Sequence, residues 1–322
     1  MKRFIATALA MLFFVAPSFG QAPAYPVKPI RLVVAYPPGG TADMLSRAIA
    51  EGVSQRLGQP VVVENKPGAN GNIAADIVAK APADGYTLLM TAPGPVAVNA
   101  SLYATLAFDP QTAFAPVSLA GVAPLILLVP QSVPVHNLQG LLDYVKANPS
   151  KAAFASQGNA SSGHLAMELL KVRTGMQATH VPYKGSSPAL NDLLAGHVLM
   201  MFDNTASSLP HVRSGALRAI AVAEERRLIA APDIPTVAES GVPGFVATPW
   251  FGVVTTAGSP AAAVDKLSAA INDTLKAPAV QARFLEIGVE LRPSTPQAFD
   301  GYIKTEAAKW KDVVRKSGAR LD

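Results

Sequence analysis

The 322-residue sequence has no cysteine, only five histidines and few charged residues. The absence of cysteine excludes a disulfide scaffold, thiol catalysis and zinc binding through thiolates. The histidines are dispersed, without an H-E-x-x-H motif or a pair at helical spacing, so no metal site is expected. The sequence also lacks a nucleophile–base pair, a P-loop and a G-x-G-x-x-G fingerprint, which predicts that the protein is not an enzyme and needs no cofactor.

Charged residues make up 15% of the chain and hydrophobic residues 50%, which allows a large buried core. Lysine and arginine outnumber aspartate and glutamate by 27 to 22. The basic residues are scattered singly, with no arginine-rich run and no basic patch interleaved with aromatic residues, so no nucleic-acid partner is expected. The mild positive charge is compatible with the binding of anionic solutes.

The chain opens with a basic and then apolar segment. Lys2 and Arg3 precede an apolar run over residues 4–15, and small residues follow up to Gly20. The apolar run is shorter than the roughly 20 residues that a membrane-spanning helix needs, which disfavours the alternative of a retained anchor. We therefore predict that residues 1–22 form a cleavable signal peptide and that the remaining chain is exported.

The rest of the chain alternates between strand-like and helix-like patterns. An apolar run over residues 30–35 predicts a buried strand, and apolar residues at helical spacing over residues 44–57 predict a helix that ends at Gly58. The alternation restarts near residue 125, so we expect an α/β protein with two lobes, each containing a mostly parallel sheet covered by helices. Further strands are predicted at residues 61–63, 87–90, 125–129, 152–155, 180–183, 198–202, 217–222 and 251–254, and further helices at residues 73–79, 138–147, 165–173, 189–194, 262–275, 278–287 and 296–317.

The first candidate binding motif is Y-P-P-G-G-T-A-D at residues 36–43, between the first predicted strand and the first predicted helix. Glycines let backbone N–H groups approach a ligand, and the first turn of a helix offers unpaired N–H groups and a partial positive charge. Such a junction is suited to binding an anion. The alternative is an ordinary turn in which Thr41 or Asp43 caps the helix.

Polar segments also follow later strands, at residues 67–72, 156–165, 181–190 and 200–208. Ser161 and Ser162 supply hydroxyls that could either cap a helix or contact a carboxylate. Asp203 lies at the carboxyl end of a predicted strand, where it could accept a hydrogen bond from a ligand hydroxyl, amine or protonated acid, or serve instead as a cap or hinge. Because arginine is absent from all these segments, we infer an anion held by backbone N–H groups, hydroxyls and bridging water.

Several longer motifs, taken together and in order, resemble the Bug-type solute receptors of tripartite tricarboxylate transporters. The matching stretches cover nearly the whole chain after the signal peptide. They include Y-P-P-G-G-T-A-D at residue 36, V-V-V-E-N-K-P-G-A-N-G-N-I-A-A-D at residue 61, A-K-A-P-A-D-G-Y-T-L-L-M at residue 79, P-Y-K-G-S-S-P-A-L-N-D-L-L-A-G at residue 182, M-F-D-N at residue 201 and P-T-V-A-E-S-G-V-P-G-F at residue 235.

The resemblance implies a two-lobed periplasmic binding protein of type II, the Venus-flytrap kind, with mixed, mostly parallel sheets flanked by helices. Residues 23–121 and 247–322 would form one lobe and residues 122–246 the other, with the ligand cleft between them. The implied function is to capture a small organic carboxylate in the periplasm and deliver it to the membrane permease subunits of such a transporter. The implied oligomeric state is a monomer.

The family pattern also implies which residues contact the ligand. They are Tyr36, Pro38, Gly39, Gly40 and Thr41 from the first lobe, and Ser156, Ser161, Ser162 and Gly163 from the second, with Asp203 at the distal end of the ligand. Two positions depart from the family, which commonly has phenylalanine at Tyr36 and glycine at Asn70. Tyr36 would add a phenolic hydroxyl to the pocket wall.

Two other functions remain open at this point. A receptor that reports to a membrane sensor kinase would bind its ligand with the same chemistry, so the sequence does not separate it from a transport receptor. A periplasmic enzyme on the same fold would require catalytic residues for which the sequence gives no motif.

Overall fold

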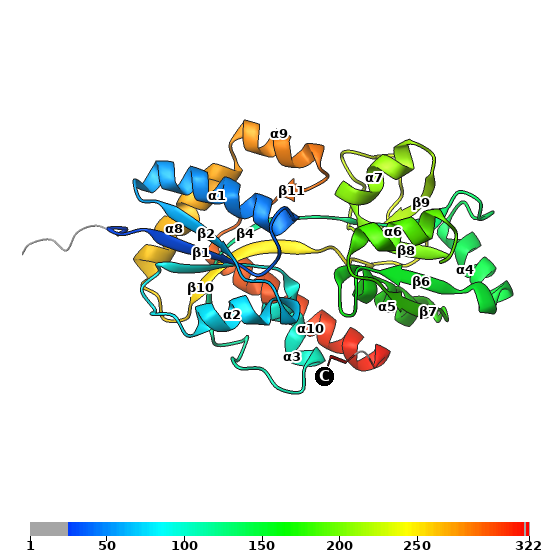
Figure 1. The fold of residues 1–322 in the computed structure, drawn as a ribbon, viewed down its shortest axis with the longest axis horizontal. Coiled ribbons are helices and arrows are strands. Elements are labelled where there is room, and N and C mark those ends of the chain that lie inside the picture. Colours follow the sequence, from blue (N-terminus) through cyan, green and yellow to red (C-terminus); the bar gives the residue numbers. More distant parts are fainter. Residues whose placement is uncertain (1–24, 319, 322) are drawn as a thin grey trace, which may run out of the picture.

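A computed structural model describes residues 25–318 and 320–321, so the predicted signal peptide lies outside the described residues. Two β-sheets lie side by side (Figure 1). The first has six strands, in the order β11 (Glu290–Leu291), β4 (Phe114–Val122), β10 (Trp250–Thr256), β3 (Thr87–Thr91), β1 (Ile30–Val34) and β2 (Val61–Asn65). The second has five, in the order β7 (Thr179–Pro182), β6 (Ala153–Ser156), β8 (Met200–Asn204), β5 (Leu125–Pro130) and β9 (Leu217–Val222).

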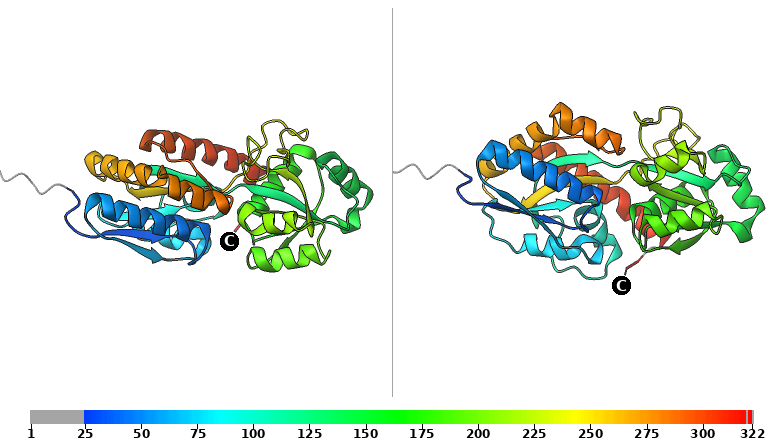
Figure 2. Two further views of the ribbon diagram at one scale, coloured as in Figure 1. Left: turned by 90° about the horizontal axis from the view of Figure 1, so that it is seen from above. Right: turned by 45° about the horizontal axis from the view of Figure 1, so that its top comes forward.

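Helices cover both faces of each sheet, as the views in Figure 2 show. On the first sheet, one face carries α1 (Thr41–Leu57), α8 (Ala261–Leu275) and α9 (Pro278–Glu286), and the other carries α2 (Asn72–Ala79), α3 (Asn99–Leu102) and α10 (Pro296–Ser317). On the second sheet, α6 (Ser186–Leu194) and α7 (Thr205–Arg213) cover one face, and α4 (Leu138–Ala147) and α5 (Ser162–Thr174) cover the other. Three short turns of helix lie at Ala69–Gly71, Gly94–Val98 and Pro149–Lys151.

Strand β1 shows why the sheet is covered on both sides. Ile30, Leu32 and Val34 pack against α1 and α8, whereas Val33 points to the opposite face and packs against α2. Side chains alternate between the two faces of a strand, so a run of consecutive apolar residues requires cover on both faces. The predicted buried strand and the helix that follows it are therefore confirmed, and α1 ends at Gly58 in a left-handed conformation, as expected.

The two-sheet α/β prediction is confirmed, but the expectation that parallel pairs predominate is corrected. Of the nine strand pairs in the described residues, four are parallel and five are antiparallel. The antiparallel pairs all involve β4, β5, β9, β10 or β11, which lie next to the two passages of the chain between the sheets. A strand that the chain forms on arriving from the other sheet runs antiparallel to neighbouring strands of the local β-α-β units.

Two of the elements that the sequence did not predict contain proline. β4 includes Pro116, which pairs with Val254 next to a break in register, where a missing backbone N–H is tolerated. α7 includes Pro210, which weakens its helical pattern.

Two passages of the chain connect the sheets. β4 ends at Val122 in the first sheet, and β5 begins three residues later in the second. The return passage leads into β10, and the two passages touch where the N–H of Ala123 donates to the Pro249 carbonyl at 2.9 Å. Helix α10 of the first half also packs against α5 of the second. Within the described residues, no helix is both long and apolar enough to cross a bilayer.

Candidate functional site

One cavity of about 750 Å³ is lined by residues from both halves of the protein. The N-terminal ends of α1, α5, α6 and α7 all reach its wall, through Thr41, Ser162, Ser186 and Asn204. Backbone N–H groups at helix N-termini carry a partial positive charge and lack partners within the helix. The full lining is Tyr36, Pro37, Pro38, Gly40, Thr41, Ala42, Asn70, Ala92, Pro93, Gly94, Val98, Gln157, Ala160, Ser161, Ser162, Leu165, Gly185, Ser186, Ser187, Asn204, Pro249 and Phe251.

The turn before α1 is held by a buried carboxylate. Asp43 accepts hydrogen bonds from the N–H of Gly39, from both sides of the Arg47 guanidinium and from the Asn65 amide, each at 3.0 Å. The hydrogen bond from Arg47 is the main cause of the lowered pKa of Asp43. Gly40 is the N-cap and has no side chain to cap the helix, so the first backbone N–H groups of α1 have no partner among the described residues. These groups are available to an anion.

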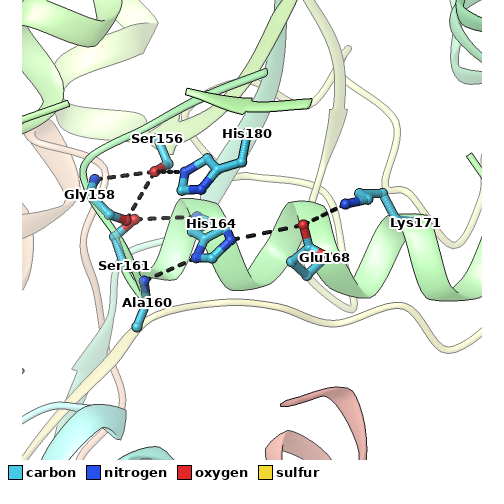
Figure 3. Close-up of polar contacts among 8 residues, drawn as sticks. All are labelled: Ser156, Gly158, Ala160, Ser161, His164, Glu168, Lys171 and His180. Carbon is cyan, nitrogen blue, oxygen red and sulfur yellow. Dashed lines mark hydrogen bonds and ion pairs between the residues drawn. The ribbon is translucent and has the colours of Figure 1, made fainter. Parts of the chain in front are cut away.

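The facing loop of the second half rests on two stacked imidazoles (Figure 3). The N–H of Ala160 donates to Nδ1 of His164 at 3.0 Å, and the His180 ring lies 3.8 Å from the His164 ring, centroid to centroid. Ser156 shares a hydrogen bond of 2.6 Å with Nε2 of His180. Phe154 lies 4.8 Å from His180 and 6.1 Å from His164, centroid to centroid, with its ring stacked on both, so the loop is supported by an aromatic layer.

Burial keeps this pair of histidines neutral. The pKa of His164 and of His180 is lowered to about 4, chiefly by burial; the charge of Lys171 contributes to both shifts and that of His164 to the shift of His180. Glu168 acts in the opposite direction on His180, and it pairs with Lys171 at 2.7 Å. Neutral His164 can accept the Ala160 hydrogen bond, which a protonated ring cannot do.

A second buried carboxylate lies behind the wall of the cavity. Asp203 is fully buried and accepts hydrogen bonds from Gln157 at 2.6 Å, Ser186 at 2.7 Å and Ser207 at 2.5 Å. Burial raises the pKa of Asp203, while hydrogen bonds from these three side chains oppose the increase. Gln157 and Ser186 line the cavity, whereas Asp203 and Ser207 are not part of its lining.

Of the ten residues expected to contact the ligand, six line the cavity: Tyr36, Pro38, Gly40, Thr41, Ser161 and Ser162. The other four are not part of its lining. Gly39 holds Asp43 through its N–H, Ser156 is buried against His180, Gly163 packs closely against Gln157 and the Phe202 carbonyl, and Asp203 anchors Gln157 and Ser186.

Two of the hydroxyl roles left open by the sequence are now visible. Ser161 is the N-cap of α5 and accepts from the N–H of His164, while it also lines the cavity. Ser162 is the first residue of α5 and also lines the cavity, and α6 begins at Ser186. Gln157 and Ser186 lie in the candidate segments at residues 156–165 and 181–190, but neither was singled out as a ligand contact. Phe251 was not expected at the site, because a single apolar residue in a strand carries no motif.

No charged side chain is among the described residues that line the cavity. Part of the wall is apolar, including Leu165, Pro249 and Phe251, and the remainder presents hydroxyls, amides and helix N-termini. This arrangement can hold an anion through backbone N–H groups and hydroxyls and pack against an apolar body. The described residues contain no group of three or more His, Asp or Glu side chains placed to bind a metal ion.

Comparison with known proteins agrees with this geometry. Residues 45–319 match the family described as "Tripartite tricarboxylate transporter family receptor". The chain is 40% identical over 302 residues to Protein BugT of Bordetella pertussis, an alignment that covers 94% of this chain and 93% of BugT.

Two similar solved structures contain a bound acid. One is R. palustris Rpa4515 with adipate, with a TM-score of 0.81 and 38% identity, covering 92% of this chain and all of that one. The other is MatC from Rhodopseudomonas palustris with bound malate, with a TM-score of 0.77 and 33% identity, covering 90% of this chain and all of that one. The chain belongs to the receptor family of tripartite tricarboxylate transporters, whose members are solute-binding receptors and not enzymes.

Proposed function

We propose that this protein captures a small organic carboxylate in the cavity between its two halves and delivers it to the permease subunits of a tripartite tricarboxylate transporter. One observation carries the proposal: four helix N-termini reach the same cavity, and none of the described residues that line it is charged. The partial positive charge at these ends favours a negative charge on the ligand, and an uncharged wall leaves that charge to be neutralised by the backbone.

The two halves are proposed to be lobes that close on the ligand, comprising residues 23–121 with 247–322 and residues 122–246. A carboxylate between Thr41 of α1 and Ser162 of α5 would contact both lobes, so its binding favours the closed state. We propose that Tyr36, Pro38 and Gly40 complete the first wall, and that Gly39, Ser156, Gly163 and Asp203 support the site without lining it.

Adipate and malate in the two similar structures support a carboxylate as the ligand class. The basic and apolar segment over residues 1–22 supports export to the periplasm, where such a receptor acts as a monomer that visits its membrane partner.

A thermal-shift screen of the purified, ligand-stripped protein tests the proposal. A ligand that binds only the folded state raises the melting temperature by mass action. We expect a rise with at least one class of small carboxylate and none with sugars or with the amides of the same acids. A rise with an uncharged control and with no acid would contradict the proposed carboxylate site.

A further inference from the structure

Two side chains in the wall of the cavity are tied from behind to the same buried oxygen. Oδ1 of Asp203 accepts from Nε2 of Gln157 at 2.6 Å and from Oγ of Ser186 at 2.7 Å. Both Gln157 and Ser186 line the cavity. The hydrogen atoms that these two side chains donate to Asp203 therefore point away from the cavity.

The Gln157 amide has no hydrogen left to donate. Its Nε2 donates to the Phe202 carbonyl at 3.1 Å as well as to Asp203, and its Oε1 is buried without a hydrogen-bond partner among the described residues. A flipped amide would set Oε1 against two acceptors, so the orientation is fixed by its surroundings. Because Oε1 is buried against Gly163, the Gln157 amide offers the ligand neither a hydrogen to donate nor an exposed acceptor.

The Ser186 hydroxyl has a single hydrogen, which it donates to Asp203. Protonation of the carboxyl group would not free this hydrogen, because the proton would sit on Oδ2. There Ser207, which lies 2.5 Å from Oδ2, could accept it and donate its own hydrogen to the Asn204 carbonyl at 3.0 Å. Ser186 therefore offers lone pairs to the cavity in either protonation state of Asp203.

We propose that Ser186 selects, among small carboxylates, those that also carry a hydrogen-bond donor such as a hydroxyl or an amino group. The inference rests on the proposed function, since it assumes that a carboxylate occupies this cavity. A donor on the ligand would pair with the Ser186 oxygen, whereas a second carboxylate oxygen or a plain methylene at that place would leave the Ser186 oxygen unpaired. Asp203 acts as a positioning residue, because it holds the two side chains without lining the cavity.

The test compares the dissociation constants of matched acids by calorimetry: succinate with malate and aspartate, and glutarate with 2-hydroxyglutarate and glutamate. For each chain length that binds, we expect the hydroxylated or aminated acid to bind about tenfold more tightly, the value of one added hydrogen bond. In Ser186→Ala this ratio should fall to about two or less, because the acceptor is gone.

Two variants separate selection by Ser186 from selection by charge or by general loosening of the network. Ser207→Ala removes another partner of Asp203 outside the cavity lining and should keep the ratio seen in the wild-type protein. Asp203→Asn removes the charge but retains an oxygen for Gln157 and Ser186, so the ratio should again persist. Melting temperatures without ligand check that each variant is folded.

The outcomes distinguish this inference from the proposed function. If carboxylates bind without a preference for the donor-bearing acid, or if Ser186→Ala keeps the full ratio, the inference is overturned and the receptor function stands. Loss of the ratio in Asp203→Asn but not in Ser186→Ala would assign selection to the carboxylate charge and would also overturn it. If no carboxylate binds, the proposed function fails, and the inference fails with it.

Discussion

His164 and His180 stack with their ring centroids 3.8 Å apart and their planes within 7° of parallel, directly beneath the loop that reaches the cavity. Both rings are neutral at pH 7, because burial lowers the pKa of each to about 4. A proton on either ring would place a positive charge against its neighbour, and a proton on Nδ1 of His164 would remove the acceptor for the Ala160 N–H. The stack therefore links the shape of the loop to pH.

We expect the free energy of unfolding to fall as the pH drops from about 6.5 to about 4. In the unfolded chain both histidines titrate near 6.5, so the unfolded state binds more protons than the folded state in this window. The stabilisation is complete above pH 7, and His164 accounts for a loss of about 1–2 kcal/mol between pH 7 and pH 5. His180 contributes less, because it is less deeply buried and water screens it more.

Urea unfolding at several pH values measures this slope. His164→Gln should flatten it, since glutamine does not titrate and its oxygen can still accept from Ala160. His136→Gln serves as the control, because His136 is exposed and its replacement should leave the slope unchanged. Equal slopes in all three proteins would show that the stacked pair does not titrate on unfolding.

Asp43 should matter for both stability and ligand binding. It is 3% exposed and accepts four hydrogen bonds, so Asp43→Ala leaves the Gly39 N–H, Arg47 and Asn65 without their shared partner. We expect a loss of about 2–4 kcal/mol in the free energy of unfolding and weaker carboxylate binding, because the turn before α1 loosens.

Asp312→Ala is the matched control for this change. Asp312 also pairs with two basic side chains, but its side chain is 46% exposed on the surface of α10, so its removal should cost much less stability than that of Asp43. Chemical unfolding and ligand titration of both variants provide the comparison. A cost for Asp43→Ala no greater than that for Asp312→Ala would refute the assigned role of the buried carboxylate.

At Gly40, a helix-capping side chain is expected to compete with the ligand. Gly40 has extended backbone angles and lines the cavity, and a Cβ there would meet no atom closer than 3.7 Å. The hydroxyl in Gly40→Ser can accept from the first N–H groups of α1, which should raise the stability by a few tenths of a kcal/mol and occupy groups that a carboxylate would use. We expect the dissociation constant to increase about tenfold.

Gly40→Ala separates capping from bulk. Alanine adds the same Cβ without an oxygen, so it should reduce affinity much less than serine and should not raise the melting temperature. Calorimetry with one acid from the screen gives both comparisons. If alanine and serine weaken binding equally, the loss is steric, and the N–H groups of α1 are not the carboxylate contact.

The strands and helices were predictable from sequence where apolar runs and spacings are strong. β1, α1 and α8 follow from such patterns, because each buries a continuous face. The two passages between the sheets were expected only from the family resemblance, and the antiparallel pairs they bring were not predictable, since strand direction depends on contacts between segments distant in sequence. β4 was missed because Pro116 interrupts its pattern.

The cavity was predictable at the level of loops but not of atoms. The glycine turn before α1 and the serine loop before α5 both reach the wall, as expected of strand-to-helix junctions. The sequence could not show which polar residue of a loop faces the ligand and which one supports it. Asp203 illustrates the limit. Its carboxylate accepts hydrogen bonds from Gln157, Ser186 and Ser207, none of which lies in the same strand as Asp203.

Gly163 gives the clearest case in which a residue expected to contact the ligand has a packing role. A Cβ at this position would lie 2.4 Å from both Oε1 of Gln157 and the Phe202 carbonyl oxygen, so alanine would push α5 away from β8. We expect Gly163→Ala to cost about 1–3 kcal/mol through this overpacking and to weaken ligand binding.

Gly301 in α10 provides the matched control. It has open space around it, and Gly301→Ala should instead stabilise the protein by about 0.5–1 kcal/mol, because alanine favours the helix. Thermal or urea unfolding of the two variants should show a loss of stability for Gly163→Ala and a gain for Gly301→Ala. A gain of stability in Gly163→Ala would contradict the close approach of α5 to β8.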